Sequence, residues 1–188
     1  MSLSDSFAIV PQMPMGKIRM MHHGWPSRSR QIELMIFMMD YVDERFSLDL
    51  MLLPGTDSYW DQLVNLVSTR KNIRIIPPVK MQDIIPTIKK YDIGVFIVPP
   101  VNFNLKNTLP NKLFEYVFAE IPVLASDFPD ISFLVNRHKL GLCVSLDVDS
   151  IAKGFKKMCS NELHLSIDAK ELIEYGWDAQ ANKLNGLY

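Results

Sequence analysis

Ile93-Gly-Val-Phe-Ile-Val98 decides the fold of this chain, together with Pro-Asn-Lys-Leu-Phe-Glu-Tyr-Val-Phe-Ala at 110–119 and Pro-Val-Leu-Ala at 122–125. The first segment is apolar throughout, which is typical of a strand buried on both faces of a sheet. The second segment begins with a proline, a residue favoured at the first position of a helix. A strand, a helix and a further strand in this order predict a parallel βαβ unit.

The same alternation of strands and helices continues in both directions along the chain. It predicts an α/β fold, namely a Rossmann-like doubly wound parallel sheet of about six strands with helices on both faces. The predicted strands are 17–22, 48–53, 73–76, 93–98, 122–125 and 142–144, and the predicted helices are 31–41, a helix from Asp57, 83–91, 110–119, 129–135, 149–158 and 167–184.

Length and composition fit one globular domain. The chain has 188 residues, of which 48% are hydrophobic and 22% are charged, and these fractions exclude a disordered chain or a coiled coil. We assign residues 17–188 to the domain, including its last helix. Residues 1–16 contain two prolines without a sustained period, and we interpret them as a leader or an inter-domain linker.

Charge, cysteine content and hydropathy argue against nucleic-acid binding, a disulfide framework, a zinc site and a membrane span. Lys and Arg number 20 and Asp and Glu 21, so the net charge of -1 does not indicate binding to nucleic acid or to an anionic membrane. Cys143 and Cys159 cannot form a disulfide framework, and their spacing matches no zinc signature. The longest apolar stretch, 93–101, is too short to span a bilayer.

Two windows without acidic residues, 6–32 and 93–114, indicate an anion site. In open parallel sheets ligands bind beyond the carboxyl ends of the strands, and both windows include loops that follow a predicted strand. These windows contain the basic residues Lys17, Arg19, Arg28, Arg30, Lys106 and Lys112.

The start of the helix at 110–119 is the best candidate for this anion. The free N–H groups and the dipole of a helix N-terminus favour a phosphate, and Lys112 adds a charge in the first turn. Glu115, about one turn further on, can accept hydrogen bonds from neighbouring hydroxyls such as those of ribose. The same residues also fit a capped, salt-bridged helix start on the surface, and spacing alone leaves both interpretations open.

Other chemical motifs are weak or missing. His22 and His23 are adjacent at a strand end, so they point to opposite faces and are a poor metal site. Either histidine fits a place near the anion or a packed position. The sequence lacks G-x-G-x-x-G, G-x-x-x-x-G-K-[ST] and G-x-S-x-G, the signatures of dinucleotide-binding, P-loop and hydrolase folds.

The segment Leu-Pro-Asn-Lys-Leu-Phe-Glu-Tyr at 109–116, followed by Ala-Glu-Ile-Pro-Val-Leu-Ala-Ser-Asp at 119–127, resembles a block of the GT-B-fold nucleotide-sugar glycosyltransferases. It is most similar to the retaining group that builds bacterial surface polysaccharides. Further similar parts are His-Gly-Trp at 23–25, Tyr-Asp-Ile-Gly-Val-Phe-Ile-Val-Pro at 91–99 and the end of the chain from Gly176. The resemblance runs in order through residues 17–188.

The resemblance implies the C-terminal, donor-binding half of such an enzyme and assigns roles to individual residues. Lys112 and Arg30, rather than Arg28, are expected to act in catalysis by neutralising the departing diphosphate, and Glu115 to hold the ribose. Enzymes of this kind need no metal or other cofactor, so UDP- or GDP-sugar enters as substrate. The remaining expected substrate contacts are Arg28, Gly24 at the phosphates, Val79 at the base, and Leu109, Pro110 and Asn111 at the helix start.

Three departures from the family pattern stand out. The first acidic residue of the family's paired motif is replaced by Asn107, our candidate for contacting the sugar, and Glu120 stands where the family usually has Gly. The acceptor-binding domain is missing from these residues, so we expect this chain alone to be an incomplete, inactive fragment.

We therefore expect a hexosyltransferase domain that moves a hexose from UDP- or GDP-sugar to a glycan or lipid-linked acceptor held by a missing N-terminal domain. We expect a cytoplasmic protein without a membrane span or nucleic-acid partner, and leave open a peripheral place at the inner membrane face. The alternatives are a non-catalytic α/β nucleotide-binding or interaction module, and half of a sugar-nucleotide epimerase.

Overall fold

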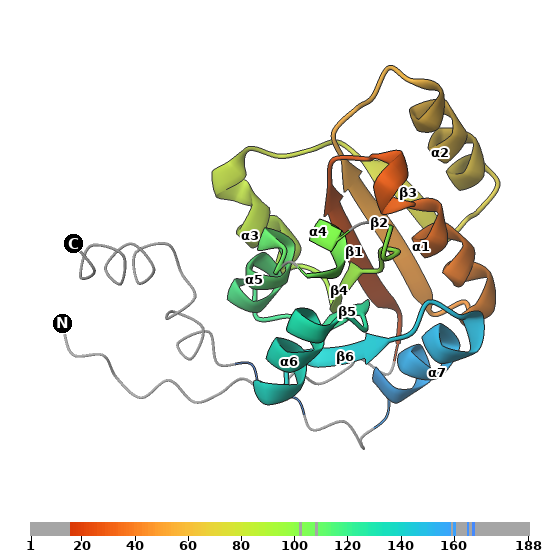
Figure 1. Ribbon diagram of the computed structural model, residues 1–188. Helices are drawn as coiled ribbons and strands as arrows, with labels where there is room; N and C mark the ends of the chain where they lie inside the picture. The colour runs from red at the N-terminus through yellow and green to blue at the C-terminus, as the bar shows by residue number, and fades with distance from the viewer. Residues whose placement is uncertain are drawn as a thin grey trace, which may run out of the picture.

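The computed structural model describes residues 16–101, 103–107 and 109–158, together with Ser160, Leu165 and Ile167. These residues form a six-stranded parallel sheet with helices on both faces, which confirms the predicted fold class (Figure 1). The predicted linker, apart from Gly16, and the predicted last helix, apart from Ile167, lie outside the described residues. Each helix within the described part is too short or too polar to span a lipid bilayer.

The strand order places a reversal in the middle of the sheet. The order is β3-β2-β1-β4-β5-β6, so the chain builds outward from β1 to β3 and then returns to place β4 on the other side of β1. Such a reversal opens a crevice at the carboxyl ends of the two central strands, where ligands bind in folds of this kind. The strands are β1 (Ile18–Gly24), β2 (Phe46–Leu52), β3 (Ile73–Ile76), β4 (Ile93–Phe96), β5 (Val123–Ser126) and β6 (Gly141–Val144).

Two helical layers cover the sheet, with α1, α2 and α7 on one face and α3, α5 and α6 on the other (Figure 1). Successive side chains of a strand point to opposite faces of the sheet, so each strand contributes to both cores. Met20 of β1 packs under the first layer and Met21 under the second. The helices are α1 (Glu33–Met38), α2 (Ser58–Ser68), α3 (Ile84–Ile88), α4 (Phe103–Lys106), α5 (Asn111–Phe118), α6 (Pro129–Arg137) and α7 (Val148–Met158), with short 3-10 turns at Arg28–Arg30, Met39–Tyr41 and Met81–Asp83.

Local boundaries around β4 and α5 differ from the prediction. Strand β4 ends at Phe96, and the Val98 N–H instead donates to Ser126 Oγ at 2.8 Å. The short helix α4 forms between the predicted strand 93–98 and the predicted helix 110–119, where no helix was predicted. Pro110 is the N-cap of α5 and not its first helical residue, because its ψ of 143° is extended.

Candidate functional site

Gly24 ends β1 beside β4, at the point where the strand order reverses. Its φ of +126° lies in a region that favours glycine. A Cβ atom on Gly24 would lie 2.6 Å from Lys112 Nζ and 3.7 Å from a terminal guanidinium nitrogen of Arg30. The absence of a side chain therefore lets two cations from different elements meet the backbone at the carboxyl edge of the sheet.

The positive charge of Lys112 is disfavoured by its surroundings. Lys112 comes from the first turn of α5 and reaches back to the end of β1. Burial, and then the positive charge of Arg30, lower the pKa of Lys112 to about 8, although Glu115 acts in the opposite direction. Arg30 donates a hydrogen bond to the Trp25 carbonyl at 3.2 Å. A partly buried ammonium beside a guanidinium is what a bound anion would stabilise.

The beginning of α5 adds hydrogen-bond donors to these charges. The first backbone N–H groups of a helix have no α-helical partner, and the N-cap residue Pro110 makes no side-chain cap bond here. Leu109 and Pro110 are half-buried at this end, whereas Asn111 is exposed. A phosphate placed before α5 would meet backbone donors and both cations together.

Glu115 lies one turn further along α5 and faces His23 of β1. Its Oε2 atom is 3.2 Å from His23 Nε2, and its side chain is 27% exposed. The carboxylate is therefore half-buried at the edge of the site rather than enclosed in the core. It remains accessible to a hydroxyl group of a ligand.

His22 points the other way and is fully buried. Its Nδ1 atom lies 2.8 Å from the Val95 carbonyl oxygen, the geometry of a neutral ring that donates from Nδ1. Burial, followed by the charge of Lys112, holds the pKa of His22 well below its usual value. This ring is uncharged at neutral pH and adds no third cation to the site.

Three other predicted site residues lie apart from this cluster. Arg28 donates to Ser58 Oγ at 2.8 Å and stacks over the Tyr59 ring, so its guanidinium turns toward α2. Val79 is 37% exposed in the loop after β3, and Asn107 is exposed and donates from its side chain to the Phe103 carbonyl. Among the described residues, no polar contact joins these three to Gly24, Arg30, Lys112 or Glu115.

Some of the basic residues in the acid-free windows do not lie at the carboxyl edge of the sheet. Lys17 precedes β1 and Arg19 is its second residue, so both lie at the amino end of the strand, away from Gly24. Sequence reasoning also missed His23 as the partner of Glu115. The available signal was that adjacent strand residues face opposite layers, which puts one histidine of the pair on the α5 side.

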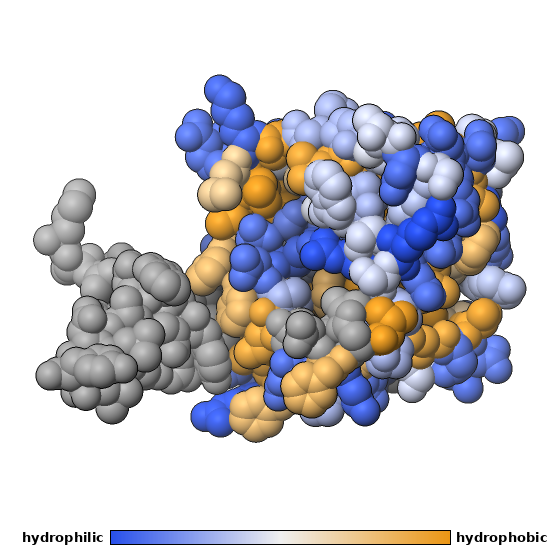
Figure 2. Space-filling model, turned by 45° about the horizontal axis from the view of Figure 1, so that its top comes forward, coloured by the Kyte–Doolittle hydropathy of each residue, from blue (hydrophilic) through white to orange (hydrophobic). Residues whose placement is uncertain are grey.

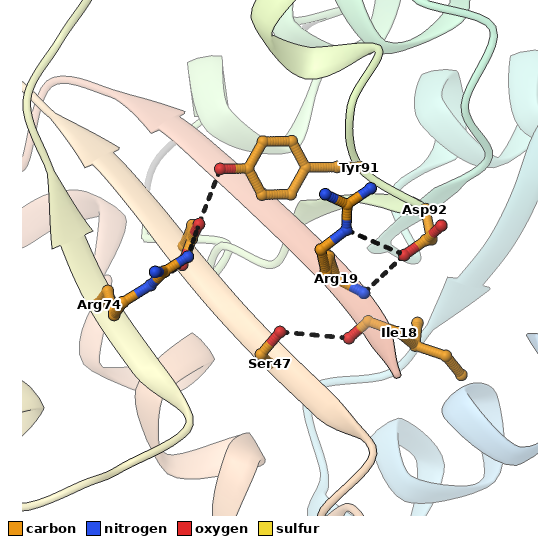
Figure 3. A network of polar contacts seen from close by, with 7 residues as sticks. Ile18, Arg19, Ser47, Arg74, Tyr91 and Asp92 are labelled. Carbon is orange, nitrogen blue, oxygen red and sulfur yellow. Dashed lines mark hydrogen bonds and ion pairs between the residues drawn. The ribbon is translucent and has the colours of Figure 1, made fainter. Parts of the chain in front are cut away.

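A second polar cluster lies toward the amino ends of β1, β2 and β3 (Figure 3). Asp49 is buried, and Arg74 holds it with two hydrogen bonds of 2.9 and 2.7 Å. The Tyr91 hydroxyl donates to the same carboxylate at 2.7 Å, and nearby Arg19 pairs with Asp92. Because each charge in this cluster has a partner, the cluster leaves little for a ligand.

Large apolar side chains are exposed in loops at the carboxyl edge of the sheet. Figure 2 shows hydrophilic residues across the middle of one face with hydrophobic residues on either side. Exposed apolar residues in the segments that follow β1 to β4 are Trp25, Leu53, Val79, Met81, Val101 and Phe103. Among the described residues, no group of three or more His, Cys, Asp and Glu side chains is arranged to hold a metal ion.

Comparison with known proteins gives matches in structure but not in sequence. Neither protein-family models nor curated protein sequences match this chain. Anabaena HepE, solved in complex with UDP and glucose, matches with a TM-score of 0.70 at 13% identity over 91% of this chain and 49% of its own. The sucrose-phosphate synthase of Thermosynechococcus elongatus matches with a TM-score of 0.69 at 16% identity, over 93% of this chain and 45% of its own.

An enzyme of another class has the same fold. The UDP-GlcNAc 2-epimerase of Methanocaldococcus jannaschii matches with a TM-score of 0.59 at 10% identity, over 87% of this chain and 47% of its own. This chain thus spans about half the length of each of these neighbours. The predicted resemblance is confirmed at the level of the fold: this chain has the Rossmann-like fold of about half of a GT-B enzyme.

Proposed function

We propose that this chain is the donor-binding half of a glycosyltransferase that takes a hexose from a UDP- or GDP-sugar. The observation that carries the proposal is the meeting of Lys112 and Arg30 at Gly24, in front of α5 and at the reversal of the strand order. Two cations, a glycine turn and free helix N–H groups are the components of a diphosphate site. The glycosyltransferase fold of the structural neighbours supports the same conclusion.

In this proposal the site acts on the leaving group. When the bond between the sugar and the diphosphate breaks, negative charge develops on the departing phosphate oxygen. Lys112, Arg30 and the helix N-terminus are already placed to stabilise that charge, so little reorganisation is needed. Glu115 accepts hydrogen bonds from the ribose hydroxyls and fixes the nucleotide relative to the cations.

The acceptor in this proposal binds to a second domain. The exposed apolar side chains in the segments that follow β1 to β4 provide a surface for that domain. The glycan or lipid-linked acceptor would then enter between the two halves, opposite the diphosphate. We accordingly expect this chain alone to bind nucleotide and to transfer little sugar.

Calorimetric titration with UDP and with GDP tests the proposal. One of the two nucleotides is expected to bind, and Glu115→Ala is expected to weaken that binding by about 1–3 kcal/mol, the value of hydrogen bonds to a charged group. Glu44→Ala in the turn before β2 is the matched control and is expected to bind like the unaltered chain. Failure of both nucleotides to bind at millimolar concentration to the folded chain would contradict the proposal.

The epimerase structure among the neighbours makes half of a sugar-nucleotide epimerase the second candidate. Both enzyme classes need the diphosphate cradle, so nucleotide binding does not separate them. Proton NMR of a UDP-N-acetylglucosamine solution containing a longer protein that includes this chain does. An epimerase inverts the sugar at C2 without any acceptor, whereas a transferase leaves the configuration at C2 unchanged.

A further inference from the structure

His23 ties the carboxylate of Glu115 to the central strand. The imidazole is 7% exposed, and its Nε2 atom lies 3.2 Å from Glu115 Oε2. Glu115 belongs to α5 and His23 to β1, so the contact joins the helix to the residue just before Gly24. The side chain that faces the ligand is thereby fixed relative to the turn at the proposed phosphate site.

The imidazole is itself held in place from the α5 side. The Tyr116 ring packs edge-on against it, with centroids 5.5 Å apart and planes at 85°. The Tyr116 hydroxyl donates toward the carbonyl oxygens of Met21 at 3.3 Å and Val95 at 3.2 Å. Gly94 makes room for this ring, because a Cβ atom there would lie 2.3 Å from it. The position of His23 is therefore set by the packing of the core.

The contact between His23 and Glu115 also separates Glu115 from Lys112. These two residues are three positions apart on α5, a spacing at which side chains are neighbours on a helix. Without another partner, the Glu115 carboxylate would form an ion pair with the Lys112 ammonium and compete with the diphosphate for it. His23 Nε2 is buried and lies within ion-pair distance of Oε2, and among the described residues it makes no well-aligned hydrogen bond.

We propose that His23 is a positioning residue that holds the Glu115 carboxylate ready for the ribose hydroxyls of the donor nucleotide. The proposal rests on the function proposed above and concerns only how the ribose is held. His23 acts through Glu115 and does not itself touch the nucleotide.

The test compares ligands that contain or lack the ribose hydroxyl on the unaltered 188-residue chain and its variants. UDP, GDP, their 2′-deoxy forms and inorganic pyrophosphate are titrated by calorimetry. The unaltered chain is expected to bind the ribonucleotide about tenfold more tightly than its 2′-deoxy form, as for a hydrogen bond to a charged group. His23→Phe keeps an aromatic ring against Tyr116 but removes the donor, and it is expected to lose this preference.

Two further measurements separate positioning from a general loss of structure. Pyrophosphate, which meets Lys112 and Arg30 but not Glu115, is expected to bind His23→Phe within about twofold of the unaltered chain. His23→Gln places an amide nitrogen near the position of Nε2, and it is expected to restore most of the preference for the ribonucleotide. If His23→Phe does not fold, His23→Leu takes its place in the comparison with His23→Gln.

The outcomes distinguish this inference from the proposed function. A ribonucleotide preference that survives in His23→Phe overturns the role of His23 and leaves the donor site standing. An equal loss of ribonucleotide and pyrophosphate affinity in that variant also overturns it, because the effect would then be general. Failure of the unaltered chain to bind UDP, GDP and pyrophosphate overturns both.

Discussion

The ammonium group of Lys112 lies against the α-carbon of Gly24, so closely that a Cβ atom on that glycine would stand 2.6 Å from Nζ. A strand end and a helix start, far apart in the sequence, thereby share one small volume. The positive charge is partly buried there, and no carboxylate of the described residues forms an ion pair with it.

Gly24→Ala is expected to weaken nucleotide binding about tenfold or more. The added methyl group pushes the Lys112 side chain out of its place, and alanine at a φ of +126° strains the backbone by about 1–3 kcal/mol. Calorimetry with UDP and GDP measures the loss of affinity. Gly16→Ala is the matched control because a Cβ atom there meets nothing within 4 Å. Equal affinities of Gly24→Ala and Gly16→Ala would show that the turn does not shape the site.

Lys112→Met is expected to stabilise the domain while weakening nucleotide binding. The folded-state pKa of about 8 lies below the ordinary value of 10.5, so keeping Lys112 charged costs free energy below pH 8, and this cost disappears as the pH rises toward 10.5. We expect the free energy of unfolding to rise by about 1–3 kcal/mol at pH 7 and by much less at pH 10. Urea denaturation at both pH values, with Lys157→Met as control, measures this difference. If Lys112→Met is less stable than the unaltered chain at pH 7, the charge of Lys112 does not destabilise the fold.

Affinity for the diphosphate is expected to fall as the pH rises above 8. In the protein without nucleotide, Lys112 loses its proton above this pH. Because a bound anion favours the charged form of Lys112, binding of the diphosphate is then coupled to uptake of a proton. Calorimetry in two buffers of different ionisation enthalpy counts this proton. Lys112→Arg is the control, because a guanidinium keeps its charge throughout this range, and its affinity is expected to stay level from pH 7 to 9. A parallel decline in both proteins would place the titrating group elsewhere.

Glu120→Gly is expected to be more stable than Glu120→Ala by about 0.5–1 kcal/mol. Glu120 has a φ of +62° after the end of α5, a conformation that glycine adopts without strain. Both variants lose the ion pair between Glu120 and Lys89, so the comparison isolates the backbone term. Urea denaturation of the two variants provides the measurement. A more stable alanine variant would contradict the assignment of strain to this residue.

The sheet could be predicted from the sequence because its signals are local. Apolar runs such as Ile93–Phe96 are separated by prolines and glycines, and the parallel pairing follows from the helices between them. The left-handed residue after α5 also had a sequence signal, since Glu120 replaces the glycine usual in the resembling family. Local patterns of this kind need no knowledge of distant contacts.

The composition of the site could be predicted only in part, because its contacts join distant residues. Sequence favoured Arg30 over Arg28 by resemblance alone, and the direction of each guanidinium depends on Ser58 and Tyr59, which belong to α2. The contact between His23 and Glu115 depends on the packing of α5 against β1. Side-chain directions of this sort are fixed by tertiary packing, which a periodic pattern does not contain.

An amide ¹⁵N–¹H NMR titration with UDP and GDP tests the central claim most directly, because it locates the nucleotide. If a diphosphate binds between the end of β1 and the start of α5, the resonances of Gly24, Asn111 and Lys112 shift together, and those of α7 stay in place. No shifts at millimolar nucleotide, or shifts confined to residues away from these two chain ends, would contradict the account.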